Sequence, residues 1–301
     1  MELRQLEYFI AVASEMNFSR AAQRVHVVQS ALSTSVGKLE KELGVELFDR
    51  SKQQIKITPA GELFRGHARR VIQTARLAKD SMSDYRGELT GTVELGSLVS
   101  SGTLDVPKIL GEFHRNYPHV RIKLRQSQTG SMTYLSSIAD GSLDLALVSA
   151  PDRFPARIEM QLLAQEPMVF VCLPDHHLAQ RDCVAIPELA DEDLIGFPAD
   201  FGLRRLVEDA FAAAGLTART PYEVPLEYSV AAGLVRHGLG TIFMPASEAR
   251  RFPDLRAVEV RPAVVWTIYL ASAEQAQMGP ASIKLADLLL ASAAAHSPRF
   301  V

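Results

Sequence analysis

The sequence predicts an α/β fold that begins with an all-α winged helix-turn-helix and a long linker helix, followed by two α/β lobes. The first 58 residues carry helical patterns, with no hydrophobic alternation until residues 54–58. An apolar repeat at heptad spacing then continues to about residue 86. From Thr92 onward strands and helices alternate, which is typical of a mostly parallel sheet with helices on both faces.

Length and composition agree with an ordinary globular protein. The 301 residues are enough for about two domains, and the apolar fraction of 47% and charged fraction of 22% exclude disordered, collagen-like and purely coiled-coil chains. The N-terminus lacks the basic and apolar segments of a secretory signal, and no run of about 18 apolar residues occurs. We therefore expect a cytoplasmic protein with no membrane contact.

Charge is distributed unevenly along the chain. Residues 1–89 contain 14 Lys and Arg against 11 Asp and Glu, a net charge of +3, whereas the remainder has 18 against 24, a net charge of −6. A basic segment is a candidate for contact with nucleic acid, although this bias is mild. The first 89 residues are thus the part in which a DNA-binding surface is expected.

The segment 18–43 predicts two short helices, 18–24 and 29–43, joined by the turn 25–28. In the second helix, one stripe is apolar at spacings of 4, 3 and 4, through Leu32, Val36, Leu39 and Leu43. The N-terminal part of such a helix contacts base edges in a helix-turn-helix. Gln suits adenine, hydroxyls are adaptable, and Lys suits guanine or a phosphate. The face opposite the stripe carries these residue types: Gln29, Ser30, Ser33, Thr34, Gly37 and Lys38.

Further DNA contacts are expected around this helix. Residues 54–58 alternate as a brief strand after the turn 49–52, which makes Arg50 and Lys52 residues of a wing. Ser19 and Arg20 are expected to cap the first of the two helices and to hold a phosphate; for Arg20, a solvated surface cation is the alternative. Gly37 sits mid-helix, at a cost of about 1 kcal/mol relative to Ala. Because it has no side chain, the helix face that would meet DNA is short and weakly charged. We expect recognition to depend also on the wing and on DNA shape.

A long helix is predicted from Thr58, as the cap, and Pro59 to about Arg86. Its apolar residues recur at spacings of 4, 3, 4, 3, 4 and 3, a heptad seam that predicts self-association of two such helices. The alternative is an amphipathic helix that lies on its own domain. The residues of the seam are Phe64, Ala68, Val71, Ala75, Ala78, Met82 and Tyr85.

The α/β part is predicted to form two lobes with a cleft between them. Strands are expected at 92–96, 120–124, 143–149, 168–174, 240–245 and 266–271, and helices at about 102–117, 131–140, 203–214 and 281–295. The domains are then 1–58 for the winged helix-turn-helix, 59–88 for the linker helix and 89–301 for the α/β domain. Lobe I takes about 89–163 and 266–301, and lobe II about 164–265.

By these motifs the chain resembles the LysR-type transcriptional regulators (LTTR family). The resemblance implies a periplasmic-binding-protein-like effector domain, homotetramers built as dimers of dimers, and control of transcription by a small-molecule effector. The implied partners are double-stranded promoter DNA, a second copy of the chain, the effector and RNA polymerase. Many members carry a long basic or amide side chain where this chain has Thr34, so base preference does not carry over. The matching segments are 6–9, 17–22, 29–33, 39–44, 47–50 and 58–61, with looser similarity at 107–118, 141–145 and 238–240.

The loop 97–103 joins the first α/β strand to the next predicted helix. Hydroxyls and backbone N–H groups at a helix N-terminus after a parallel strand favour an anion, so a small carboxylate is the expected ligand class. Simple helix capping by Ser and Thr is the alternative. The resemblance places six residues at the effector pocket: Ser100, Ser101, Thr103, Ser131, Phe201 and Gly202.

Neither catalysis nor a bound cofactor is expected. Nucleophile-elbow, phosphate-loop and zinc-protease motifs are absent from the sequence. The pair His176 and His177 has no third ligand at a suitable spacing, and it is therefore interpreted as part of an exposed loop and not as a metal site. Cys172 and Cys183 are interpreted as ordinary thiols. A redox pair is the alternative, although their spacing differs from that expected of a peroxide-sensing member of the family.

The sequence leaves a second class of function open. The α/β lobes could belong to a cytoplasmic small-molecule-binding protein or enzyme, with the N-terminal helices serving as a dimerisation module. DNA binding by the full chain separates the two readings.

Overall fold

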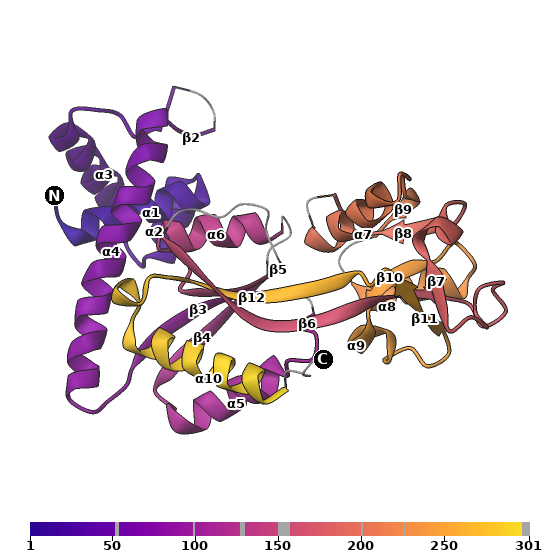
Figure 1. Cartoon of the computed structure of the whole chain (residues 1–301). Coiled ribbons are helices and arrows are strands. Elements are labelled where there is room, and N and C mark those ends of the chain that lie inside the picture. The colour runs from indigo at the N-terminus through magenta and orange to yellow at the C-terminus, as the bar shows by residue number, and fades with distance from the viewer. Residues whose placement is uncertain are drawn as a thin grey trace. The chain divides into compact units, whose positions relative to one another are not determined.

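The computed structural model describes residues 1–51, 54–98, 100–126, 130–149, 157–199, 201–224 and 227–296. The chain divides into two compact units, Met1–Leu89 with Ala139–Ser142, and Thr90–Ile138 with Leu143–Val301 (Figure 1). Within the described ranges, no helix combines the length and the apolar character needed to cross a membrane.

The first unit opens with a helix-turn-helix and a small wing. Helices α1 (Leu3–Glu15), α2 (Phe18–Arg24) and α3 (Gln29–Leu43) precede the antiparallel strands β1 (Phe48–Asp49) and β2 (Lys56–Ile57). The predicted bounds of α2 and α3 are confirmed, whereas the wing strand is only two residues long. Between α2 and α3, His26 has a φ of 56°, a left-handed conformation that non-glycine residues seldom adopt.

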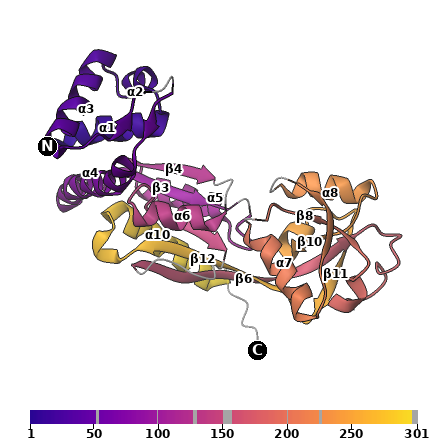
Figure 2. The same cartoon turned by 90° about the horizontal axis from the view of Figure 1, so that it is seen from above.

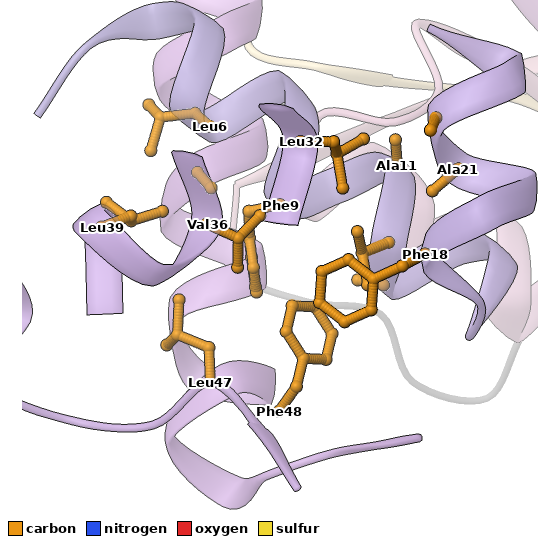
Figure 3. Packing of buried hydrophobic residues seen from close by; sticks show 14 residues of the cluster. Leu6, Phe9, Ala11, Phe18, Ala21, Leu32, Val36, Leu39, Leu47 and Phe48 are labelled. Atoms are coloured by element: carbon orange, nitrogen blue, oxygen red, sulfur yellow. The ribbon is translucent and has the colours of Figure 1, made fainter. Parts of the chain in front are cut away.

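The core of this unit lies between the three helices and the wing (Figure 3). Leu32, Val36 and Leu39 are each 0% exposed, so the predicted apolar stripe of α3 faces inward. The ring of Phe9 lies 5.4 Å from that of Phe48 on β1, measured between centroids. Burial of each large side chain contributes roughly 1.5–3 kcal/mol, which fixes α3 in one rotation about its axis.

Helix α4 (Pro59–Tyr85) begins as the sequence predicts. The Thr58 hydroxyl accepts a hydrogen bond from the Gly61 N–H at 3.0 Å. A Cβ atom on Gly61 would lie 2.3 Å from the Leu47 carbonyl oxygen, so only glycine lets α4 pass this close to the wing. Along the predicted seam, Phe64 and Ala68 pack on the winged domain; the exposed remainder consists of Val71, Ala75, Ala78, Met82 and Tyr85.

The second unit contains a mixed sheet in its first lobe. The strands run in the order β4-β3-β5-β12-β6, in which β3 is parallel to β4 and β5, while β12 is antiparallel to β5 and β6. The expectation of a mostly parallel sheet is therefore wrong, because β12 returns along β6 from the second lobe. The strands are β3 (Gly91–Ser97), β4 (Val120–Gln126), β5 (Leu145–Ser149), β6 (Ile158–Cys172) and β12 (Val265–Ala273).

Helices cover both faces of this sheet, as Figure 1 shows. Helix α6 (Ser131–Ala139) packs against Ala146 and Val148 of β5, whereas the alternate residues Leu145 and Leu147 face the other side. That side carries α5 (Val106–Asn116) and α10 (Pro280–His296), which contact each other. Because β5 is buried on both faces, it reads as a continuous apolar run.

The second lobe is assembled from shorter elements. The end of β6 pairs with β10 (Ile242–Pro245) and β11 (Arg256–Arg261), and β11 pairs with β7 (Cys183–Ala185). A two-stranded sheet of β8 (Asp193–Gly196) and β9 (Arg219–Glu223) lies beside them, and β6 and β12 run between the lobes (Figure 2). The helices of this lobe are α7 (Gly202–Ala213), α8 (Tyr228–Arg236), α9 (Ala246–Ala249) and the short turn η1 (Ile186–Leu189); η2 (Gln275–Gln277) follows β12.

Candidate functional site

The outer face of α3 is polar and open to solvent. Four residues of the expected reading face are exposed, and Ser33 and Gly37 are half-buried. Val28 occupies the N-cap position before the helix, but its side chain forms no capping hydrogen bond and is 69% exposed. The first turn of α3 therefore presents uncapped N–H groups and an aliphatic side chain beside the polar face. Its exposed polar residues are Gln29, Ser30, Thr34 and Lys38.

The residue that caps α2 differs from the expectation. Asn17 is the cap, because its Oδ1 accepts a hydrogen bond from the Arg20 N–H at 3.0 Å. The prediction that Ser19 and Arg20 cap this helix is wrong, since both lie inside its first turn, and both are exposed. The Arg20 guanidinium donates to the Glu15 carbonyl oxygen at 2.7 Å, which holds it beside the end of α1.

The Glu40 carboxylate connects α3, the second helix of the helix-turn-helix, to the wing. Glu40 on α3 accepts hydrogen bonds from the backbone N–H groups of Leu47 at 2.9 Å and Phe48 at 3.2 Å. Its second oxygen accepts from Arg50, whose guanidinium lies 4.9 Å from the centre of the Phe18 ring. Arg50 thus makes contacts within the domain, to Glu40 on α3 and to Phe18 on α2. Sequence reasoning missed Glu40, and the predicted wing residue Lys52 lies outside the described residues.

A pocket lies between the two lobes of the second unit. It includes four of the six residues expected there: Ser100, Ser131, Phe201 and Gly202. Sequence reasoning missed the other residues of its lining, of which the aromatic ones follow no local pattern that marks a site. They are Ser97, Leu98, Gln126, Gly130, Tyr134, Ser149, Leu203, Tyr228 and Trp266.

Ser101 and Thr103 do not line this pocket, because α5 starts later than predicted. Asp105 caps α5 by accepting a hydrogen bond from the Lys108 N–H at 3.0 Å, so residues 101–104 form a turn instead of a first helical turn. The Ser101 hydroxyl donates to the Leu104 carbonyl oxygen at 2.7 Å, and Thr103 is exposed. Ser101 and Thr103 are therefore not placed at the first turn of this helix, and an anion site in this loop stays a prediction.

Two other helix N-termini do reach the pocket. Ser131 is the first residue of α6 and Gly202 the first of α7. The Ser131 hydroxyl accepts from the Ser149 N–H at 3.2 Å, and the Trp266 indole donates to the Ser149 hydroxyl at 3.0 Å. Among the described lining residues, none is Lys, Arg, His, Asp or Glu. Hydroxyls, an amide, aromatic rings and helix N-termini are thus the groups available to a ligand.

The Tyr228 hydroxyl is a buried polar group without a partner. Of the buried side-chain nitrogen and oxygen atoms in the described part of the chain, only this one makes no hydrogen bond. Burial, aided by the negative charges of Glu248 and Glu166, raises the pKa of Tyr228 well above its usual value. An unsatisfied buried hydroxyl costs about 1–3 kcal/mol, so a ligand that bonds to it gains affinity.

Glu166 lies where β6 passes from one lobe to the other. It pairs with Trp266 of β12, and two residues later β6 pairs with β10. The carboxylate accepts hydrogen bonds from the Ser247 N–H and hydroxyl, both at 2.9 Å. Burial raises the pKa of Glu166 in spite of these bonds. A Cβ on Gly102 would lie 2.5 Å from its Oε1, so the 101–104 turn closes over the same carboxylate.

The two cysteines are free thiols on opposite sides of β11. Cys172 is in register with Arg256, and Cys183 is in register with Glu259, three residues further along. Two strand spacings of about 4.8 Å separate them, beyond the Cα separation of about 7 Å that a disulfide tolerates. Burial raises the pKa of Cys172 to about 11. Ordinary thiols are favoured over a redox pair.

Comparisons with known proteins cover both units. The family descriptions "Bacterial regulatory helix-turn-helix protein, lysR family" and "LysR substrate binding domain" match residues 3–62 and 86–294. The HTH-type transcriptional regulator ShiR of Corynebacterium glutamicum (strain R) is 33% identical over 279 residues, 88% of this chain and 92% of ShiR.

Solved structures agree with these matches. A full-length OxyR variant from Pseudomonas aeruginosa has the same fold, with a TM-score of 0.77 and 24% identity over 97% of this chain and 94% of that one. Full-length CbnR complexed with its target DNA gives a TM-score of 0.66 with 26% identity, over 97% of this chain and 100% of that one. The helix-turn-helix, the two-lobed domain and these matches make the chain a member of the LysR family of DNA-binding transcriptional regulators.

Proposed function

We propose that the protein binds double-stranded promoter DNA as a dimer or a dimer of dimers, and that a small carboxylate in the pocket modulates this activity. The observation that carries the DNA-binding part is the polar, solvent-exposed face of α3 opposite the buried side chains of Leu32, Val36 and Leu39. Two such helices enter successive major grooves about one turn apart, and phosphate contacts make the affinity depend on salt. The CbnR complex with its target DNA supports this reading at 26% identity.

Self-association is proposed to use α4. Val71, Ala75, Ala78, Met82 and Tyr85 leave an apolar row exposed on a single chain. A partner helix in the same position covers such a row at heptad spacing. The dimer then places two copies of α3 on one DNA site, in the cytoplasm where promoter DNA and RNA polymerase are found.

The ligand class follows from the lining of the pocket. The N-termini of α6 and α7 favour one negative charge, and the described lining offers hydroxyls but no cationic side chain to balance a second. A compact monocarboxylate therefore fits better than a phosphate ester. Because the lining comes from both lobes, the ligand favours one lobe arrangement, and it acts only through its different affinity for the two states.

DNA binding is tested with the labelled fragment upstream of the gene at low salt. We expect Gln29→Ala with Lys38→Ala to weaken binding by about tenfold or more, because a base contact and a phosphate contact are lost. The matched control, Gln275→Ala with Lys284→Ala, makes the same changes on exposed residues of the effector domain. An absence of binding at low salt, or equal affinity of the two double variants, contradicts the proposal.

The ligand class is tested by thermal shift of the full chain against metabolic acids and neutral analogues. Binding to the native state raises the melting temperature, and at a fixed ligand concentration a tighter ligand raises it more. Ser131→Ala is expected to reduce the shift, while Ser247→Ala, outside the pocket lining, is not. Stabilisation solely by neutral or cationic compounds contradicts a carboxylate.

We propose that the pocket binds its ligand without catalysing a reaction. The residues of its lining that the structure describes include no carboxylate, imidazole or thiol that could act as a general base or a nucleophile. A small-molecule-binding protein or enzyme with a helical dimerisation module is the competing function. Turnover of a stabilising ligand by the full chain, unchanged by Gln29→Ala with Lys38→Ala, supports that competing function instead.

A further inference from the structure

A cluster of three potential metal ligands lies in the second lobe, away from the effector pocket. His176 and His177 follow β6, and Glu192 directly precedes β8. One ligand atom from each residue lies within 4.8 Å of the others. The sequence alone indicates an exposed loop without a third ligand; the fold instead leaves His176 half-buried and brings Glu192 to it from 16 residues further along the chain.

We propose that His176, His177 and Glu192 form a binding site for a divalent transition-metal ion of the zinc class. Two imidazoles and one carboxylate are a ligand set that Zn²⁺ accepts, with a remaining position open to water or another ligand. None of the three residues lines the effector pocket. The site is independent of the proposed function.

The distances match the requirements of such an ion. His176 Nε2 lies 3.2 Å from Glu192 Oε2, and His177 Nε2 lies 3.7 Å from Glu192 Oε1. Ligand atoms at about 2.0–2.1 Å from a tetrahedral zinc ion are roughly 3.3 Å from one another, so the His176 contact already fits. The His177 contact is to the other carboxylate oxygen, and the three candidate ligand atoms, which lie within 4.8 Å of one another, must move closer around an ion. The remaining adjustment falls on His177, whose side chain is 68% exposed and can turn at little cost.

The charges around Glu192 also favour a cation. This carboxylate is 13% exposed, and its described ion-pair partners are the two imidazoles, which are uncharged unless protonated. A largely buried carboxylate is costly without a balancing positive charge. Two arginines of this lobe are paired with other carboxylates, Arg181 with Glu188 and Arg219 with Asp193. A divalent ion held between the three side chains supplies the missing positive charge.

Metal binding changes one hydrogen bond in a way that can be observed. His176 Nδ1 accepts a long hydrogen bond from the Leu178 N–H at 3.3 Å, so Nε2 carries the proton and donates it to Glu192. An ion at Nε2 moves this proton to Nδ1, and the contact with the Leu178 N–H must open. The Leu178 amide is therefore a local reporter of occupancy.

The experiment is a titration of the full chain with Zn²⁺ after removal of metals by a chelator. Equilibrium dialysis is expected to give one tight ion per chain, and Co²⁺ is expected to give the intense visible absorption of a tetrahedral site. His177→Ala and Glu192→Gln should each weaken binding by about tenfold or more. The controls His119→Ala and Glu274→Gln make the same changes on exposed residues elsewhere and should bind as the parent does.

The exposed position of His177 keeps the test decisive, because its replacement by alanine leaves packing intact. In amide NMR spectra, Zn²⁺ should shift the Leu178 signal of the parent and leave it unchanged in His177→Ala. Weak binding of several ions with equal affinity in His119→Ala and His177→Ala would overturn the proposal. A chain that binds no zinc at micromolar concentration would do the same.

Discussion

The Arg50 guanidinium in the wing donates a hydrogen bond of 2.6 Å to the Glu40 carboxylate on α3. The same carboxylate accepts two backbone N–H groups at the start of the wing, and Arg50 lies over the Phe18 ring. These contacts join α3, β1 and α2. They therefore fix the position of α3 relative to the wing. Lys38, by contrast, is exposed on the outer face of α3.

The two cations should therefore respond differently to removal. Lys38→Gln is expected to lower the slope of log affinity for DNA against log salt by about 1, with stability unchanged. Arg50→Gln is expected to lower the free energy of unfolding by about 1–2 kcal/mol and to change the slope less, because its donors are engaged within the domain. Filter binding over a range of salt concentrations and urea denaturation measure the two effects. An equal loss of slope with no loss of stability in Arg50→Gln would make Arg50 a phosphate contact instead.

Gly37 is predicted to trade helix stability for close approach of DNA. A Cβ at this position meets no protein atom within 4 Å, so Gly37→Ala should raise the free energy of unfolding by about 1 kcal/mol. DNA affinity should fall, since Gly37 lies among the residues that face the groove. Gly66→Ala is the matched control, because that helical glycine on α4 is equally unhindered. Both variants should gain stability, and unchanged DNA binding in Gly37→Ala would show that the DNA does not approach this position.

Val28 is predicted to contact the methyl groups of thymine bases. It caps α3 without a side-chain hydrogen bond and is 69% exposed, so the position is not optimised for stability. Val28→Thr should raise the free energy of unfolding by about 1 kcal/mol through a restored cap, but weaken DNA binding because a hydroxyl replaces one of the two methyl groups that can contact thymine. Replacing thymine by deoxyuridine in the binding site should weaken the parent and affect Val28→Thr less.

The matched control for this test is Val45→Thr, at the other end of α3, where Val45 is also exposed. Its response to deoxyuridine should equal that of the parent. If deoxyuridine leaves the affinity of the parent unchanged, Val28 contacts no thymine methyl group.

Local signals explain why α2 and α3 could be predicted to the residue. The buried stripe of α3 follows from spacing alone, and Gly44, with a φ of 70°, ends the helix where glycine is favoured. The capping residue of α2 and the start of α5 differ from the prediction because several polar residues compete for one cap. Only the fold selects Asn17 and Asp105 from among them.

Contacts between distant segments could not be predicted. Glu40 reaches the wing, Glu192 reaches His176, and Tyr228 enters a pocket whose other side comes from the first lobe. Each depends on the path of the chain through strands that have little pattern of their own, such as β7 with three residues and β8 with four. The mixed sheet has the same cause, since the pairing of β6 with β12 joins segments about 100 residues apart.

The exposed row on α4 is predicted to form the dimer contact. Met82 is 59% exposed and Tyr85 is 87% exposed on a single chain. Met82→Glu should convert the dimer to a monomer at micromolar concentration, because two carboxylates would face each other across the seam. Met82→Leu is the control and should remain dimeric. Light scattering after size-exclusion chromatography measures the mass, and a Met82→Glu variant that stays dimeric places the interface elsewhere.

Glu166 is predicted to make stability depend on pH. Its pKa in the folded chain is raised above the ordinary value of 4.5, mainly by burial. A raised folded-state pKa contributes stability that is fully present below the unfolded-state pKa and is lost as pH rises through the folded-state pKa. Relative to Glu166→Gln, which does not titrate, the parent should therefore lose stability as pH rises above about 4.5.

Urea denaturation of both proteins between about pH 5 and pH 8 measures this difference. The charged neighbours Glu248 and Arg250 are present in both proteins, so their own titration largely cancels in the comparison. The side-chain amide of the Glu166→Gln variant still offers an oxygen acceptor to the Ser247 N–H, which keeps the contact between β6 and α9. A difference that does not change with pH would mean that Glu166 titrates in the folded chain as it does in the unfolded chain. The carboxylate would then be too well solvated for its protonation to affect stability.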